Sequence, residues 1–193
     1  METEIKLPET VFVVDASFLE FATLNLKSFF EQHLGRTLDE IDLSLLFTYL
    51  MLDTEISIDD KQVQVLLAYD GETENFSVCS PSSLKEELNG VAFKNEELGE
   101  FLFASTTTEG MVSREELFLD LVRVSCENDN VKNIVLLTRE DEYSQELRNL
   151  IEENKDKNIS QFGITKQPLS TTITYFLFAY PAMKAMGIRG DEL

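Results

Sequence analysis

The sequence predicts an α/β protein with a mostly parallel central sheet and helices on both faces of that sheet, in three layers. Short apolar runs, typical of strands that are buried on both faces, recur at residues 10–15, 63–70, 133–138 and 158–164. Segments with apolar residues at helical spacing separate these runs. Because strands that alternate with helices pair in parallel through right-handed crossovers, the alternation predicts one sheet that is covered on both sides.

Capping-box sequences predict where the first helices begin. Residues 17–20 have the spacing of such a box directly after the first strand, and residues 37–40 repeat it before a second helical stretch. The strand at 63–70 is followed by a glycine-containing turn. We expect residues 75–79, beyond that turn, to pair back as a hairpin.

The second half of the chain repeats the alternation of helices and strands. Capping boxes at residues 83–86, 113–116 and 138–141 predict three more helices. An alternating pattern at residues 100–105 predicts a further strand. Residues 170–186 are predicted to form the last helix, with a bend at its proline.

The composition indicates a folded and strongly acidic protein. The chain has 193 residues, of which 36 are acidic and 16 basic, and its formal net charge is -20. The length fits a single domain over residues 1–193, and the 43% of apolar residues argue against global disorder. A surface this negative repels phosphate, which argues against duplex DNA and disfavours single-stranded RNA as a partner. A basic protein is the partner that the charge favours.

The cysteines and the apolar stretches indicate the cellular setting. Cys79 and Cys126 belong to no metal-binding pattern, which predicts buried free thiols. The first ten residues lack the features of a signal peptide, and the apolar segment at 173–188 is too short to cross a bilayer. We therefore expect a cytoplasmic protein that is not inserted in a membrane. The oligomeric state stays open, and apolar residues in excess on the Phe-rich first helix would form a homodimer contact.

Acidic residues follow several of the predicted strands. Asp15 ends the first strand, Asp70 ends the strand at 63–70, and Glu140 and Glu142 follow the strand at 133–138. Asp120 lies on a helix whose first turns could lean over the same edge of a parallel sheet. Carboxylates bind hard cations such as Mg²⁺ or Mn²⁺, and a pair of such ions can activate water and hold a phosphodiester. The sequence therefore predicts a metal site formed by these acids.

Two segments resemble the PIN-like fold, specifically its NYN branch of ribonucleases. The first is VVDASFLEF at residues 13–21, in which an aspartate at the end of a strand precedes a small polar segment. The second is TREDEY at residues 138–143, which has the hydroxyl, acid, acid and aromatic order of a Ser-Gly-Asp-x-Asp-Phe turn in that family. The resemblance extends over about residues 11–20 and 113–164.

The resemblance implies a Mg²⁺-dependent nuclease site. It would be built from Asp15, an acid of the preceding helix (Asp120 or Glu116), Glu140 and Glu142. The sequence also departs from the family at this turn, because an arginine stands in place of the motif's glycine and glutamates replace both aspartates. The longer glutamate side chains would displace any metal, and geometry at such sites is demanding.

Most of these acids also have a purely structural interpretation. Asp15 and Asp70 could accept hydrogen bonds from local amides as turn residues, and Glu140 and Glu142 could be acids that a helix N-terminus favours. Glu116 is the third residue after a serine, where a capping box places an acid. The sequence thus leaves two functions open. One is a metal-dependent ribonuclease, and the other is a catalytically eroded PIN-like module whose acidic surface binds a basic partner without nuclease activity.

Overall fold

The structure is a computed structural model that describes residues 6–139, 144–166, 170 and 172–193. Its main strands are β1 (Thr10–Asp15), β3 (Gln62–Tyr69), β5 (Val91–Asn95), β6 (Gly99–Thr107), β7 (Asn133–Leu137), β8 (Asn158–Gly163) and β9 (Thr174–Leu177). They form one seven-stranded sheet in the order β5-β6-β3-β1-β7-β8-β9. Only β5 runs antiparallel to its neighbour, so the sheet is mostly parallel, as predicted.

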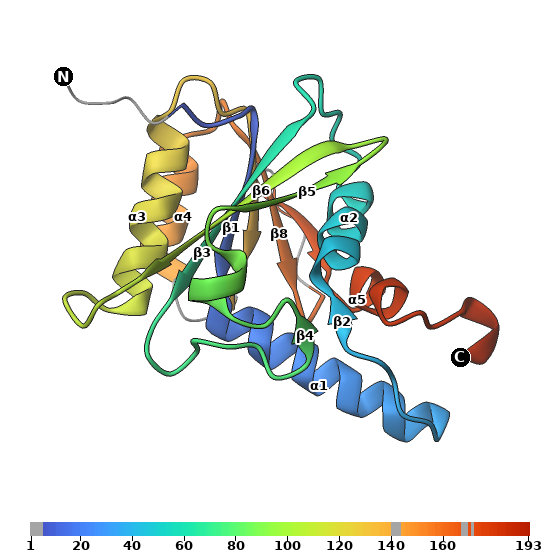
Figure 1. Cartoon of the computed structure of the whole chain (residues 1–193). Helices are drawn as coiled ribbons and strands as arrows, with labels where there is room; N and C mark the ends of the chain where they lie inside the picture. The colour runs from blue at the N-terminus through green and yellow to red at the C-terminus, as the bar shows by residue number, and fades with distance from the viewer. Residues whose placement is uncertain (1–5, 140–143, 167–169, 171) are drawn as a thin grey trace.

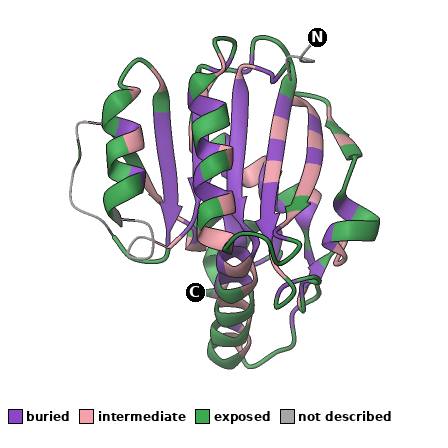
Figure 2. Cartoon of the chain, turned by 90° about the vertical axis from the view of Figure 1, so that its left-hand side faces the viewer, coloured by how far each residue is buried: buried purple, intermediate pink, exposed green. Residues whose placement is uncertain are grey.

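Helices cover both faces of this sheet, which confirms the predicted three-layer α/β class. They are α1 (Ala16–Leu34), α2 (Leu43–Asp53), α3 (Arg114–Glu127), α4 (Ser144–Glu153) and α5 (Ala179–Ala185), with the shorter η1 (Leu84–Leu88) and η2 (Gly190–Glu192). Figure 1 shows α3 and α4 on one side of the sheet, α2 and α5 on the other, and α1 leaving the end of β1. Figure 2 looks onto the side of α3 and α4, whose outer faces are exposed while the strands behind them are largely buried.

The central strand β1 explains the continuous apolar run at the start of the chain, because all six of its residues are buried. Phe12 and Val14 belong to the apolar cluster that includes side chains of α1, α2 and α5. Val11 and Val13 belong to the second cluster, together with side chains of α3 and α4. Successive side chains of a strand point to opposite faces, so a strand with a core on each face needs apolar residues at every position.

Two predicted helix starts are wrong by a few residues, for one physical reason. Asp15 rather than Ser17 is the N-cap of α1, and Asp42 rather than Thr37 is the N-cap of α2. Each aspartate ends a strand and turns its carboxylate back toward two amides of the following helix. Aspartate caps helices at least as well as serine or threonine, so the acid that adjoins the strand takes this position.

Two other predicted N-caps are confirmed. The Ser113 hydroxyl accepts a hydrogen bond from the Glu116 amide at 3.1 Å, and the Glu116 carboxylate accepts one from the Ser113 amide at 2.9 Å. Ser83 accepts a hydrogen bond from the Glu86 amide at 3.2 Å, at the start of η1. The capping box predicted at 138–141 extends outside the described residues.

The predicted hairpin at residues 75–79 is wrong. Asn75 forms an isolated bridge with Ser83, whereas β4 (Cys79–Ser80) pairs in parallel with β2 (Ile41–Asp42) in a small second sheet. The partner of β4 lies far back in the chain, and the local glycine turn that suggested a hairpin carries no information about it.

The last helix, predicted at 170–186, is wrong in its first half. Residues 174–177, with the sequence TYFL, form β9 beside β8, and among the residues of this range that the structure describes only those of α5 form an α-helix. β-branched and aromatic residues favour strands, and the open edge of β8 provides hydrogen-bond partners for them. β5, the antiparallel edge strand, was not predicted from the sequence.

Candidate functional site

The candidate site lies at the carboxyl edge of the sheet, where the chain changes the direction in which it adds strands. From β1 the chain adds β3 and β6 on one side, and then places β7, β8 and β9 on the other. Ligands of α/β proteins bind at such switch points. Asp15 ends β1 and Asp70 directly follows β3, the parallel neighbour of β1. The fold therefore brings two of the predicted acids to one edge.

Asp15 provides a nearly inaccessible carboxylate, with a side chain that is 1% exposed. Its Oδ1 atom accepts a hydrogen bond from the Ser17 amide at 2.9 Å and a longer one from the Phe18 amide at 3.4 Å. These amides belong to the first turn of α1, where the helix dipole also favours a negative charge. Because a buried charge remains costly, a cation is needed nearby as well.

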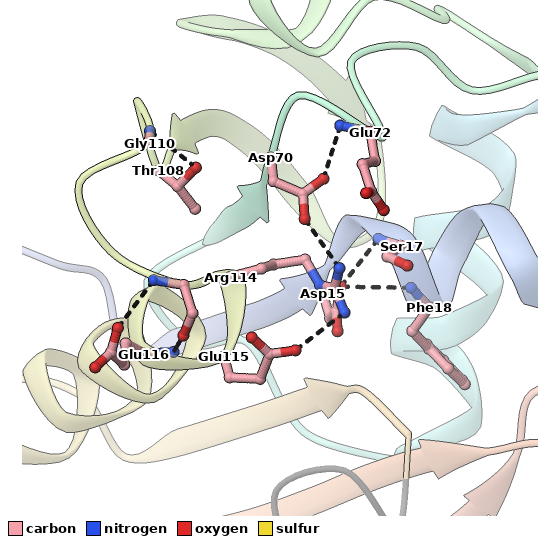
Figure 3. Close-up of polar contacts among 11 residues, drawn as sticks. Asp15, Ser17, Phe18, Asp70, Glu72, Thr108, Gly110, Arg114, Glu115 and Glu116 are labelled. Carbon is pink, nitrogen blue, oxygen red and sulfur yellow. Dashed lines mark hydrogen bonds and ion pairs between the residues drawn. The ribbon is translucent and has the colours of Figure 1, made fainter.

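Arg114, the first residue of α3, supplies this cation (Figure 3). Its Nε atom lies 3.1 Å from Asp15 Oδ1, and its Nη1 atom lies 3.0 Å from Asp70 Oδ2. The Nη2 atom is 3.4 Å from the Glu115 carboxylate. The other carboxylate oxygen of Asp70 accepts a hydrogen bond from the Glu72 amide at 3.0 Å. Arg114 therefore joins the ends of two neighbouring strands to the start of α3.

The position of the guanidinium limits the chemistry of this edge. Asp15 and Asp70 are two of the acids predicted to hold Mg²⁺ or Mn²⁺, and Arg114 lies between them with a side chain that is only 14% exposed. A guanidinium stays protonated and has no coordination position at which water could be activated. Among the residues that the structure describes, no group of three His, Cys, Asp or Glu side chains is arranged to hold a metal ion. Of the predicted metal ligands, the structure thus places Asp15 and Asp70 at this edge, and Arg114 occupies the space between their carboxylates.

The other predicted site residues do not join Asp15 among the described residues. Asp120 lies further along α3 with a side chain that is 59% exposed, and it forms an ion pair with Arg123. Glu116, the alternative to Asp120, is the N3 residue of the capping box at the start of α3, in which Ser113 is the N-cap. Glu140 and Glu142 lie outside the described residues.

Arg114 was not predicted as a site residue, although one signal in the sequence pointed to it. A basic residue in the first turn of a helix is disfavoured by the helix dipole, unless nearby acids compensate for it. Arg114 has this position, directly after the N-cap Ser113. An arginine at such a place indicates an acidic partner elsewhere in the fold.

The end of β7 forms the opposite side of the switch point. The Arg139 guanidinium lies 4.4 Å from the centre of the Phe21 ring of α1, a cation–π contact. Thr138 is completely buried, and its hydroxyl finds no hydrogen-bond partner in the part of the chain that the structure describes. Arg139 thus connects the end of β7 to α1, the helix that Asp15 caps.

Neither cysteine belongs to this edge. Cys79 and Cys126 are buried free thiols, as predicted. Burial raises the pKa of Cys79 to about 12 and that of Cys126 to about 11, because a thiolate is poorly solvated inside the protein. Neither is therefore suited to act as a nucleophile near neutral pH.

Fold and site together define an acidic three-layer α/β protein, with two strand-end aspartates bridged by an arginine. Over residues 4–193 the chain matches a family of unknown function (DUF6621), and it belongs to that family. No curated protein and no solved structure matches it. None of the helices in the described part of the chain combines the length and the apolar character that a membrane crossing requires.

Proposed function

We propose that this protein is a non-catalytic acidic module that binds a basic protein partner, the second of the two functions that the sequence leaves open. The observation that carries the proposal is the Arg114 guanidinium, 3.1 Å from Asp15 and 3.0 Å from Asp70. A metal-dependent nuclease needs a divalent ion with free positions for water and phosphate between such acids. Here a side chain of the protein itself neutralises them.

The charge of the molecule supports the binding half of the proposal. A net charge of -20 attracts basic surfaces over distances of about a Debye length, roughly 8–10 Å in physiological salt, and repels nucleic acid. On this proposal, the departures from the PIN-like turn at residues 138–143 mark a nuclease site that has lost its function. Asp15 is then kept because it stabilises the sheet edge.

An RNA cleavage assay tests the non-catalytic half. Labelled single-stranded RNA is incubated with the protein and with Mg²⁺ or Mn²⁺. We expect no more cleavage by the wild type than by Asp15→Asn. Asp156→Asn is the matched control, because the Asp156 side chain is 75% exposed and belongs to neither predicted site. Metal-dependent cleavage that disappears in Asp15→Asn and persists in Asp156→Asn would contradict the proposal.

Crosslinking followed by affinity purification tests the binding half. We expect the crosslinked proteins to be basic and their capture to weaken as salt is added, because screening reduces attraction between exposed charges. Capture that is insensitive to salt, or partners without basic segments, would contradict a basic partner.

A further inference from the structure

A cavity of about 290 Å³ opens between the edge of the main sheet and the small sheet of β2 and β4. Its apolar walls come from β5, β6, η1 and the start of α2, through Val91, Phe93, Phe103, Leu88 and Leu43. This volume is at the lower end of the usual range for small-molecule sites, about 300–1,000 Å³. It suits an inserted side chain better than an extended cofactor.

The wall formed by β5 is well ordered by aromatic packing. Phe93 stacks on Phe101 with ring centres 4.6 Å apart and contacts Phe103 at 5.8 Å. Val91, two residues earlier on the same face of β5, is 42% exposed. The cavity is therefore a fixed apolar hollow with an accessible apolar residue at its mouth.

Acidic residues lie on the opposite wall. Asp42 and Glu40 line the cavity, both are exposed, and no basic side chain is among the lining residues. Asp42 Oδ1 accepts a hydrogen bond from the Ser44 amide at 2.7 Å as the cap of α2. The surrounding half of the chain, residues 1–100, carries 21 acidic and 6 basic residues, a net charge of -15. The walls thus combine apolar surface with unbalanced negative charge.

Beside the apolar wall and the acidic wall, the cavity has a third feature, which is the free edge of β5. In the described structure β5 pairs with β6 alone, so alternate peptide groups along its other side face away from the sheet. A strand added to this edge would point every second side chain toward the face that Val91 and Phe93 occupy. This is the geometry by which sheet edges bind extended peptides.

We propose that this groove binds an extended basic segment of a partner protein. The segment adds a strand to β5, inserts an apolar side chain into the cavity, and places a neighbouring lysine or arginine beside Glu40 and Asp42. Charge complementarity selects this occupant. An acidic segment, or a second copy of this acidic chain, would be repelled. The inference rests on the proposed function and names where on the molecule the basic partner binds.

The test uses a short labelled peptide in which lysine and valine alternate, with a peptide of alternating glutamate and valine as its counterpart. Fluorescence anisotropy should show that the lysine peptide binds the wild type and that the glutamate peptide does not. Val91→Arg should weaken binding of the lysine peptide by about tenfold or more, because it places a cation at the cavity mouth. Val124→Arg is the matched control, since Val124 is 44% exposed on α3, and it should change the affinity by no more than about twofold.

A second pair of variants distinguishes the effect of charges at the cavity from the effect of the protein's net charge. Glu40→Lys should weaken binding strongly, whereas Glu127→Lys, an equal change of charge at the end of α3, should not. Methylating alternate peptide nitrogens of the probe should also reduce binding if the segment pairs with β5.

The outcomes distinguish the two proposals. If the lysine peptide binds the wild type and all four variants equally, the groove is not the binding site, while the proposed function stands. If Val91→Arg and Glu40→Lys weaken binding but the methylated probe binds normally, the added strand is contradicted. If the lysine peptide does not bind the wild type even at low salt, the proposed basic partner is contradicted as well.

Discussion

A buried carboxylate lowers the stability of a protein unless hydrogen-bond donors or a cation surround it. Asp15 obtains both, because α1 supplies two amides and Arg114 supplies the charge. Asp70 shares the same guanidinium from the next strand. At the scale of single residues, Arg114 thus decides whether this edge is a metal site or a structural ion-pair network.

The stability of Arg114→Met tests this role. Methionine retains part of the apolar stem and removes the charge, so the free energy of unfolding should fall by about 3 kcal/mol, as when one partner of a buried ion pair is removed. Arg123→Met is the matched control, because the pair of Arg123 and Asp120 is 48% and 59% exposed and should contribute less than about 1 kcal/mol. Urea unfolding followed by circular dichroism measures both losses. Equal, small losses would contradict the structural role of Arg114.

The sequence predicted part of this residue-level picture. It placed Asp15 and Asp70 at one sheet edge, because a parallel strand that ends in an acid leaves that acid at the carboxyl edge. It also predicted the capping role of Glu116. The role of Arg114 could not be predicted in the same way, because its partners lie in two distant segments that only the tertiary structure brings together.

At the scale of elements, the start of β6 depends on Gly99. This residue has a φ of 97°, and a Cβ atom built there would lie 2.1 Å from the carbonyl oxygen of Lys61. The approach is close because the Glu100 amide donates a hydrogen bond to that carbonyl at 2.9 Å.

Gly99→Ala should therefore lower the free energy of unfolding by about 2 kcal/mol or more, through strain at positive φ and the backbone clash. Gly71→Ala is the control, since Gly71 has open space around it, and it should change stability by less than about 0.5 kcal/mol. Thermal or urea unfolding measures both effects. Similar stabilities for the two variants would contradict the pairing of β6 next to Lys61.

The element η1, which forms one wall of the cavity, should become less stable at acidic pH because of Glu87. Its carboxylate accepts hydrogen bonds from the amides of Ser83 at 2.9 Å and Ser82 at 3.0 Å. These bonds, the one from Ser83 first, hold the pKa of Glu87 below its ordinary value. A lowered pKa in the folded state means that the stabilisation is complete above the unfolded pKa, about 4.3 for glutamate, and is lost as the pH falls through the folded pKa.

Hydrogen-exchange protection of the η1 amides should accordingly be constant from neutral pH to about pH 4.3 and decrease at lower pH. In Glu87→Gln this step should be absent, whereas Glu86→Gln, in the same turn, should retain it. Protection in the wild type that persists unchanged through the acid range would show that Glu87 does not hold this turn.

The elements that the sequence predicted best are the buried parallel strands. β1 begins and ends where expected, β7 and β8 each end one residue earlier than predicted, and β3 is shifted by one residue at both ends. Their continuous apolar runs are needed because both faces are covered. Elements at the edges were predicted poorly. β5 and β9 are only partly buried, so their pattern is weak, and the pairing of β2 with β4 depends on contacts between distant segments.

At the scale of the whole molecule, fold class and charge followed directly from the sequence, while strand order did not. Alternating strands and helices predict a parallel sheet but not the side of β1 on which each later strand is added. The observed order places the switch point beside Asp15 and the free edge at β5. The first is the site of the proposed loss of metal chemistry, and the second is the proposed docking edge.

Thermal unfolding of the wild type and of Asp15→Asn, each with and without millimolar Mn²⁺, tests the central claim that Arg114 takes the role of the metal. A cation that binds only the folded state raises the melting temperature by mass action. We predict no such rise for the wild type, and a lower melting temperature for Asp15→Asn at any Mn²⁺ concentration, because the buried guanidinium loses a charged partner. A rise for the wild type that Asp15→Asn abolishes, together with unchanged or higher stability of Asp15→Asn without metal, would contradict the claim.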